Sequence, residues 1–208
     1  MLKSFFVSAM IIAAPMAAQA EDIKKAVFAG GGFWGVECNF EHLDGVKEAV
    51  SGFAGGTKRN PTYKSFGNHL EAVEVTYDAD MVSYAELVDV LLRSSDVIDD
   101  GGQFCDRGAN YATGIFASGA EAKVAADVIA KHDASGKLPK SIVTPILPKA
   151  KFYKVGEYHQ DYYKSEKVVL TRRGPLTKAK AYKFYRKGCG RDKRVRQLWG
   201  AQAYIPKL

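Results

Sequence analysis

A run of three glycines, Gly30 to Gly32, stands between a short apolar segment and a predicted helix, and it is the first place where the sequence could do chemistry. Glycines let the backbone approach a ligand closely, and the first turn of a helix presents unpaired N–H groups with partial positive charge. Such a turn can hold an anion, an oxyanion or a thiolate. No Lys-Ser or Lys-Thr pair follows the glycines, which disfavours a phosphate loop. Phe33 and Trp34 come next and, taken alone, fit core packing better than ligand binding.

Three cysteines, Cys38, Cys105 and Cys189, are the other residues with evident chemistry. None belongs to a CxxC motif and no spacing of His and Cys matches a zinc site, so no metal site is expected. An odd number leaves one thiol unpaired within the chain. Cys38 follows Gly32 by six residues on the predicted helix, which places it about 9 Å further along the axis and turned away. We therefore expect Cys38 to be a buried small hydrophobic residue.

Hydrophobic periodicity predicts the elements that must position these residues. Strands are predicted at residues 25–29, 46–53, 69–77 and 111–117, with an edge strand marked by Pro145 at residues 142–147. Helices are predicted at residues 33–42, 84–93 and 120–132. The second helix opens with Ser83 and Glu86 at the spacing of a capping box.

The order of these elements up to residue 117 is strand, helix, strand, strand, helix, strand. That order predicts an α+β fold, the ferredoxin-like two-layer βαββαβ sandwich with helices on one face of the sheet. The length of 208 residues and the hydrophobic fraction of 47% suit one domain and exclude a disordered chain. Residues 1–148 carry 13 basic and 19 acidic side chains, whereas residues 149–208 carry 17 and 4. We expect this basic C-terminal tail, residues 149–208, to wrap the core as coil and short turns.

Residues 1–20 have the three parts of a secretory signal peptide. Lys3 is followed by a mostly apolar run, and a small-x-small cleavage site ends at Ala20. The apolar run is short for a membrane span. We therefore expect cleavage after Ala20, a mature domain of residues 21–208 without a membrane segment, and a secreted or periplasmic location.

Several segments carry a resemblance to a known family, and they occur in order from about residue 25 to residue 200. They are VFAGGGFWGVE, GFAGGTKRNPTYKSF, HLEAVEVTYD, QFCDRGANY, YHQDYYKS and KFYRKGCGRDKRVRQLWG. With these segments the chain resembles the A-type peptide-methionine (S)-S-oxide reductases, and the last two resemble a bacterial branch of that family. The resemblance covers nearly the whole predicted mature domain.

This resemblance implies a site residue by residue. The central motif of the family is Gly-Cys-Phe-Trp-Gly, whose cysteine attacks the sulfoxide sulfur and becomes a sulfenic acid. Gly32 stands at the position of that cysteine, so the nucleophile is absent. Phe33 and Trp34 match the aromatic pair that holds the S-methyl group of the substrate. Glu71 matches the carboxylic acid that protonates or hydrogen-bonds the sulfoxide oxygen.

Three more residues match the family in the same way. Tyr63 and Tyr111 match two tyrosines directed at the sulfoxide oxygen, and Asp106 matches a supporting aspartate. The set makes chemical sense, because aromatic walls suit a methyl group and hydrogen-bond donors suit a sulfoxide oxygen. Burial beside aromatic rings is expected to raise the pKa of Glu71 and keep it a donor near neutral pH.

The chain also departs from the family pattern outside position 32. The segment before Glu71 is shorter than in the family, which could reposition Glu71 and Tyr63. Residues 110–113 lack an arginine of the family pattern, and residues 95–98 replace a His-Asp-Pro-Thr stretch. In the family, tail cysteines often resolve the sulfenic acid. That task is vacant here, and a disulfide between Cys105 and Cys189 is one option that the sequence leaves open.

Three functions follow from these observations. The first, which we favour, is a catalytically impaired relative that still binds methionine sulfoxide in exported proteins. The second is a working reductase that uses another cysteine, or in which Gly32 is an artefact, with a thioredoxin-like or other thiol reductant and no bound cofactor. The third is an exported basic module that binds acidic surfaces through the tail. Export and the resemblance of the tail to the family argue against nucleic acid as a partner, and we expect a monomer.

Overall fold

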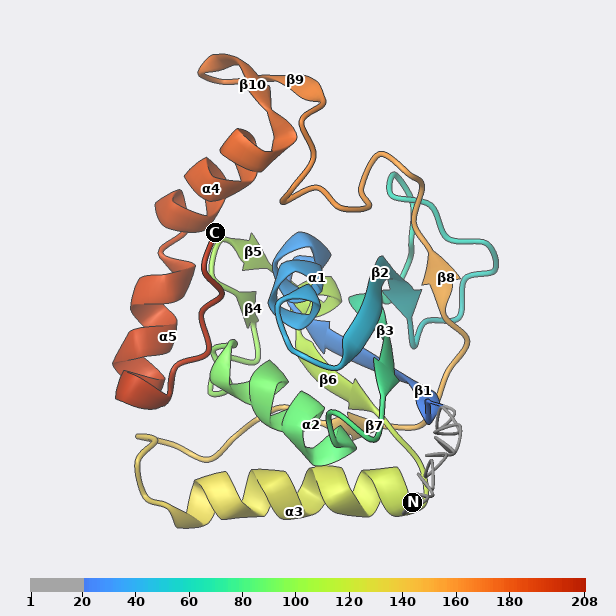
Figure 1. Ribbon diagram of the computed structural model, residues 1–208, viewed down its shortest axis with the longest axis vertical. Coiled ribbons are helices and arrows are strands. Elements are labelled where there is room, and N and C mark those ends of the chain that lie inside the picture. Colours follow the sequence, from blue (N-terminus) through green and yellow to red (C-terminus); the bar gives the residue numbers. More distant parts are fainter. Residues whose placement is uncertain (1–20) are drawn as a thin grey trace, which may run out of the picture.

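The computed structural model describes residues 21–208, and a central six-stranded sheet organises it (Figure 1). Its strands are β1 (Ile23–Gly30), β2 (Val46–Ala54), β3 (Leu70–Asp78), β6 (Thr113–Phe116), β7 (Ile146–Leu147) and β8 (Tyr153–Lys154). They lie in the order β7-β6-β1-β3-β2-β8, and each neighbouring pair is antiparallel except β6 and β7. The signal-peptide prediction for residues 1–20 lies outside the described residues.

Three helices accompany the sheet in the first part of the chain. They are α1 (Phe33–Glu41), α2 (Tyr84–Arg93) and α3 (Ala120–Ala134). Helices α1 and α2 pack against the sheet around the main hydrophobic core, where the rings of Phe28 in β1 and Phe40 in α1 stack with centroids 5.1 Å apart. The predicted capping box of α2 is confirmed, because Glu86 N–H donates to Ser83 Oγ at 3.2 Å and Ser83 N–H donates to Glu86 Oε2 at 2.8 Å.

The side chains of β1 alternate between two apolar clusters, as expected for a strand that is covered on both faces. Ala26 and Phe28 belong to the main core, whereas Ala29 belongs to a second cluster against which Val27 packs. Because both faces are covered, β1 is held firmly in the middle of the sheet. Its last residue therefore gives a fixed position to the glycine turn that follows.

The predicted elements up to residue 117 are confirmed in type and order. The last of these strands, β6, begins at Thr113 rather than residue 111, because residues Ala109–Tyr111 form a 3-10 turn. The edge strand expected around Pro145 is confirmed as β7 at the end of the sheet. A small hairpin of β4 (Gly102–Gln103) and β5 (Asp106–Arg107) was not predicted, since strands of two residues leave no periodic pattern.

The prediction that the tail forms coil and short turns is wrong. After β8 the tail contains a hairpin and two helices: β9 (Val168–Thr171), β10 (Gly174–Thr177), α4 (Lys178–Gly188) and α5 (Arg191–Trp199). The helical period was hidden because three of the eight buried positions in α4 and α5 are cations, namely Lys178, Arg186 and Arg191. Within residues 21–208 no helix has the length and apolar character needed to cross a membrane.

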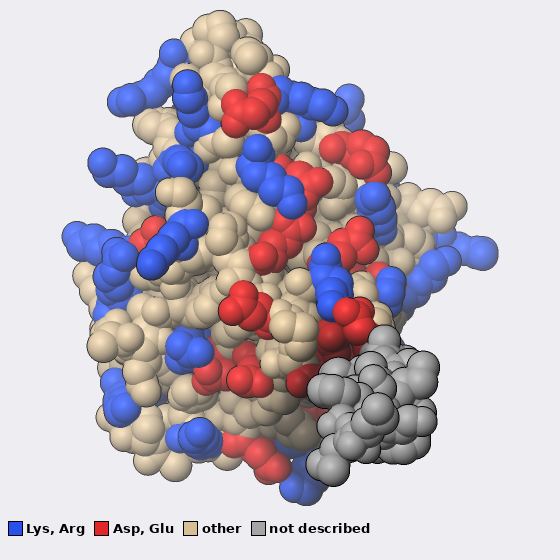
Figure 2. Space-filling view, in the orientation of Figure 1, with Lys and Arg blue, Asp and Glu red and all other residues tan. Residues whose placement is uncertain are grey.

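The tail nevertheless packs along the body of the protein. Strand β8 joins the sheet beside β2, and the indole Nε1–H of Trp199 donates to the carbonyl oxygen of Ser95 at 3.4 Å. Ion pairs also join the two parts, such as Arg194 with Asp96 at 2.6 Å. Figure 2 shows Lys and Arg side chains gathered on the side of α4 and α5, with Asp and Glu side chains more central. Part of the positive charge of the tail is thus paired with carboxylates of the body.

Candidate functional site

One cavity of about 430 Å³ collects the residues that the sequence singles out. It lies at the N-terminal end of α1 and is lined by the nucleophile position of the family and by the six other predicted site residues: Gly32, Phe33, Trp34, Tyr63, Glu71, Asp106 and Tyr111. These residues come from the β1–α1 turn, the first turn of α1, the loop before β3, β3 itself, β5 and the 3-10 turn before β6. The shortened segment before Glu71 therefore removes neither Glu71 nor Tyr63 from the cavity.

Gly31 and Gly32 in the glycine turn differ in whether the structure requires a glycine. Gly31 has a φ of +84°, and a Cβ atom there would lie 2.4 Å from Cβ of Gln103, so only glycine fits. Gly32 has ordinary angles for an L-residue, with φ of −54° and ψ of 121°. A Cβ atom at Gly32 would lie 2.6 Å from Oδ2 of Asp106 and 4.0 Å from Oε2 of Glu71. The carboxyl group of Asp106 thus occupies the space where a side chain at position 32 would begin.

Glu71 is held beside the first turn of α1. Its side chain is buried, and Oε2 accepts a hydrogen bond from the backbone N–H of Phe33 at 3.0 Å. Burial raises the pKa of Glu71 to about 7, the N–H of Phe33 opposes that rise, and the charge of Asp106 adds to it. Near neutral pH a large fraction of Glu71 is therefore protonated and able to donate a hydrogen bond into the cavity.

Opposing effects act on the pKa of Asp106. Burial raises its pKa, whereas the guanidinium of Arg191 and the backbone amide of Gly32 favour the charged form. Arg191 is the first residue of α5, and its guanidinium stacks over the ring of Phe104 at 4.3 Å. A Cβ atom at Gly35 would lie 2.9 Å from Cζ of Arg191, so the glycine in α1 makes room for this cation. Burial lowers the pKa of Arg191 to about 10, which still leaves it charged at neutral pH.

The aromatic wall is larger than the sequence predicted. Trp34 stacks on Tyr162 with centroids 3.8 Å apart, and the ring of Tyr63 lies 3.9 Å from that of His159. Tyr158 and Tyr162 also line the cavity, and both belong to the segment YHQDYYKS that carried part of the resemblance. That segment was the signal that could have assigned them to the site. The Nε1 atom of Trp34 is buried and has no hydrogen-bond partner among residues 21–208.

The two predicted tyrosines are donors at neutral pH. Burial raises the pKa of Tyr63, and it raises the pKa of Tyr111 to about 12; in both cases the charge of Glu71 adds to the effect. Tyr63 is 45% exposed, which places it at the mouth of the cavity rather than at its base. Both hydroxyl groups stay protonated over the range in which Glu71 titrates.

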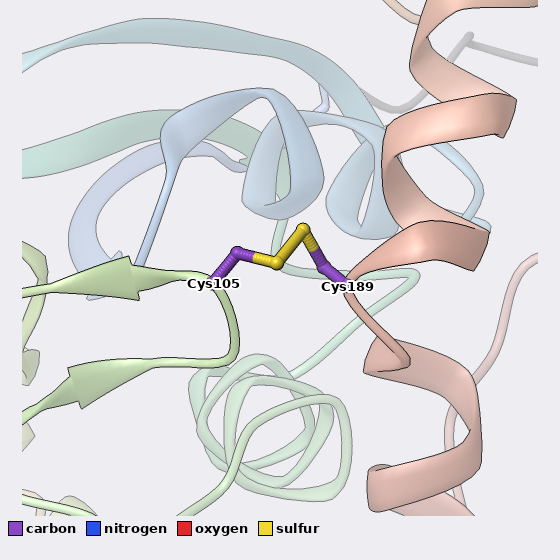
Figure 3. Close-up of a disulfide and its surroundings, with 2 residues drawn as sticks. All are labelled: Cys105 and Cys189. Carbon is purple, nitrogen blue, oxygen red and sulfur yellow. A yellow bond between two sulfur atoms is a disulfide. The ribbon is translucent and has the colours of Figure 1, made fainter.

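Cys105 and Cys189 form a disulfide, the option that the sequence had left open (Figure 3). It joins the β4–β5 turn to the end of α4 across 84 residues of sequence, with the two Cα atoms 5.2 Å apart. Cys189 lines the cavity, whereas Cys105 does not. Cys38 is a free, buried thiol, as expected, and burial raises its pKa to about 11, so it is neutral at physiological pH.

One cluster of carboxylates outside the cavity has the spacing of metal ligands. Oxygen atoms of Glu37, Glu41 and Asp161 lie within 4.8 Å of one another. The oxygens of Glu37 are engaged by the Oγ–H of Ser51 and the backbone N–H of Asp161, and Glu41 pairs with Lys164 at 2.6 Å. Hydrogen bonds and ion pairing therefore account for this cluster without a metal.

Comparison with known proteins gives matches to a single protein family. The family model described as "Peptide methionine sulfoxide reductase" matches residues 24–200. The chain is 44% identical over 207 residues to "Peptide methionine sulfoxide reductase MsrA 2" of Rhizobium meliloti, covering 98% of this chain and 96% of that protein. It is 43% identical over 153 residues to "Peptide methionine sulfoxide reductase MsrA" of Listeria welshimeri, covering 71% and 86%.

Two solved structures are similar in fold. Methionine sulfoxide reductase A of Corynebacterium diphtheriae matches with a TM-score of 0.59 and 30% identity, over 67% of this chain and 73% of that one. Reduced Mxr1 of Saccharomyces cerevisiae matches with a TM-score of 0.60 and 28% identity, over 67% and 83%. Both likenesses support the mixed α+β fold with a central sheet.

Proposed function

The chain belongs to the peptide methionine sulfoxide reductase family, and we propose that it binds methionine-(S)-sulfoxide in proteins but lacks the thiol with which reduction begins. One observation carries this proposal. Gly32 stands where the family resemblance puts the nucleophile, and the Asp106 carboxyl group fills the start of the missing side chain, 2.6 Å from its Cβ position. A carboxyl group in that place cannot take up the sulfoxide oxygen as a sulfenic acid does.

The binding half of the chemistry is supported by the groups that remain. Protonated Glu71 and the hydroxyl groups of Tyr63 and Tyr111 line the cavity as donors for a sulfoxide oxygen. Phe33 and Trp34 supply the apolar wall that an S-methyl group needs. These are the groups that would hold the substrate whether or not a thiol attacks it.

The reductive half needs a thiolate that attacks the sulfoxide sulfur. In the family reaction implied by the resemblance, the oxygen passes to the cysteine as a sulfenic acid and methionine is released. A second thiol then forms a disulfide with that cysteine, and water leaves. Among residues 21–208 no free thiol lines the cavity, because Cys38 is buried elsewhere and Cys189 is disulfide-bonded. The comparisons do not favour the alternatives, a reductase that works through another cysteine or a basic module for acidic surfaces.

Three finer assignments belong to the same proposal. We assign the sheet to the ferredoxin-like class, supported by the order β6-β1-β3-β2 with α1 and α2 in the connections. Cleavage after Ala20, export and exported substrate proteins stay predictions, supported by the pattern of residues 1–20. A monomeric state also stays a prediction. A thioredoxin-like or other thiol reductant is needed only by a form of the protein that turns over.

Ligand titration tests the proposal directly. N-acetyl-methionine-(S)-sulfoxide methylamide should change the fluorescence of Trp34 and bind more tightly than its R epimer and the thioether. With dithiothreitol, the unmodified protein should form no N-acetyl-methionine methylamide. Trp34→Phe, which keeps Trp199, is the control that assigns the signal to the cavity. Equal affinity for sulfoxide and thioether would remove the binding assignment. Turnover that disappears in Cys189→Ala would instead support a reductase that uses another cysteine.

A further inference from the structure

A second hollow adjoins the cavity on the tail side. It is lined by six residues of the β9–β10 turn and α4: Arg172, Arg173, Phe184, Tyr185, Gly188 and Cys189. Tyr185 and Cys189 also line the first cavity, so the two spaces share part of a wall. The two spaces are therefore neighbours on the same side of the molecule.

The second hollow has the character of a site for negative charge. Arg172 and Arg173 form the two-residue turn between β9 and β10, and both are exposed. Neither pairs with a carboxylate within residues 21–208, and no acidic residue lines the hollow. The guanidinium of Arg173 rests over the ring of Phe184 at 4.5 Å, which holds its planar donors at the surface. Guanidinium groups bind carboxylates through paired N–H donors.

The chain between the two spaces is continuous and mostly apolar. Val169, Leu170 and Thr171 of β9 line the first cavity, and the next residue, Arg172, lines the second hollow. Leu170 is 85% exposed, so it offers an uncovered apolar contact beside the cavity mouth. A polypeptide that enters the first cavity with one side chain would therefore run along β9 toward the two arginines. Such a chain advances at most about 3.6 Å per residue, so only residues near the inserted side chain can reach the second hollow.

We propose that this second hollow is a subsite for an acidic side chain of the polypeptide whose methionine sulfoxide occupies the first cavity. The inference rests on the proposed function for its first anchor, and it adds a preference for substrate segments with Asp or Glu close to the oxidised methionine. The body of the protein supplies the groups for the sulfoxide, and the β9–β10 turn supplies the charge that selects its neighbours. The two arginines are then specificity-determining residues and take no part in the sulfoxide chemistry.

Three peptides of one length test the subsite. They carry methionine-(S)-sulfoxide at the centre, with Asp, Asn or Lys pairs on both sides, and are titrated by calorimetry. The Asp peptide should bind roughly 3- to 10-fold more tightly than the Asn peptide, the Lys peptide most weakly, and the differences should shrink in high salt. In Arg172→Ala/Arg173→Ala the Asp and Asn peptides should bind alike, with the affinity of the Asn peptide unchanged.

A matched control separates the subsite from general attraction to a basic protein. Lys193→Ala/Arg196→Ala removes the same charge from exposed positions of α5 that line neither space. It should keep the preference for Asp. If both double variants lose that preference equally, or if neither loses it, the subsite is wrong.

The Asn peptide also distinguishes this inference from the function on which it rests. If the sulfoxide form of the Asn peptide binds no better than its methionine form, the proposed function fails. If it binds better but Asp adds nothing, only the subsite fails. Absence of binding by every peptide would overturn both.

Discussion

The cavity has two halves that differ in what they contribute. The body half, its lining residues between 32 and 111, holds both carboxyl groups and the two tyrosines that suit a sulfoxide oxygen. The tail half, its lining residues between 158 and 191, holds further tyrosines, exposed Leu170, Cys189 of the disulfide and Arg191. The groups that act on the sulfoxide therefore belong to the body half, whereas the tail half enlarges the cavity and adds groups that can select the substrate. A change in one half should leave the contribution of the other measurable.

The largest effect is expected from Gly32→Cys, which gives the body half its missing thiol. The angles of Gly32 suit any L-residue, and the new Cβ must displace only the end of the Asp106 side chain. Reduction of the sulfoxide methylamide with dithiothreitol should rise at least about 10³-fold over the unmodified protein, since loss of a nucleophile costs rates of that order or more. Chromatography of the product, N-acetyl-methionine methylamide, measures the rate.

Gly32→Ser is the matched control for this gain. It adds the same Cβ atom and displaces Asp106 in the same way, but it brings no thiol. It should stay inactive. If Gly32→Cys is equally inactive while its circular dichroism and sulfoxide affinity are normal, the other departures from the family pattern have disabled the body half as well.

Removal of the disulfide should have the next largest effect, and it should fall on stability. Cys105→Ala/Cys189→Ala opens a loop that spans 84 residues, which should lower the free energy of unfolding by about 2–4 kcal/mol. Affinity for the sulfoxide methylamide should change far less, because its donors lie in the body half. Urea denaturation measures the stability. A reducing agent should bring the unmodified protein to the level of the variant and leave the variant itself unchanged; a drop in both would contradict a role for the disulfide.

A third test concerns the contact between the halves at Gly35. Gly35→Ala places a methyl group 2.9 Å from Cζ of buried Arg191, and such overpacking should cost about 1–3 kcal/mol. This cost opposes a gain of about 1 kcal/mol from replacing glycine inside a helix. In an Arg191→Ala background the clash is gone, so the same substitution should be neutral or stabilising. An equal loss in both backgrounds would show that Arg191 is not what position 35 accommodates.

The two halves also differ in how far sequence predicts them. Gly32, Trp34 and Glu71 sit in short local motifs, and the elements that carry them follow from local periodicity. All three line one cavity. Arg191 had no such signal, because a buried cation breaks the apolar period of its helix. The disulfide depends on a contact across 84 residues, and local spacing cannot fix such a pairing. The position of Asp106 against Gly32 depends on a hairpin too short to be read from its pattern.

The smallest expected effect is a pH dependence that belongs to the body half alone. Burial raises the pKa of Glu71 from 4.5 to about 7. Below that pH the group is protonated and donates to a sulfoxide oxygen, and above it the carboxylate repels the oxygen. Affinity for the sulfoxide methylamide should therefore fall by about 10-fold as the pH rises from 6 to 8, the worth of one hydrogen bond lost to a charged acceptor. His159 does not interfere, because burial lowers its pKa to about 4.

The control variant is Glu71→Gln. Its amide keeps an N–H donor for the ligand and an oxygen that accepts from the N–H of Phe33, so it should bind the ligand with an affinity that does not vary over this range. Fluorescence titration at each pH measures both proteins. If the variant shows the same decline, another group titrates, such as Glu37 in α1, whose pKa burial also raises to about 7, and Glu71 is not the donor.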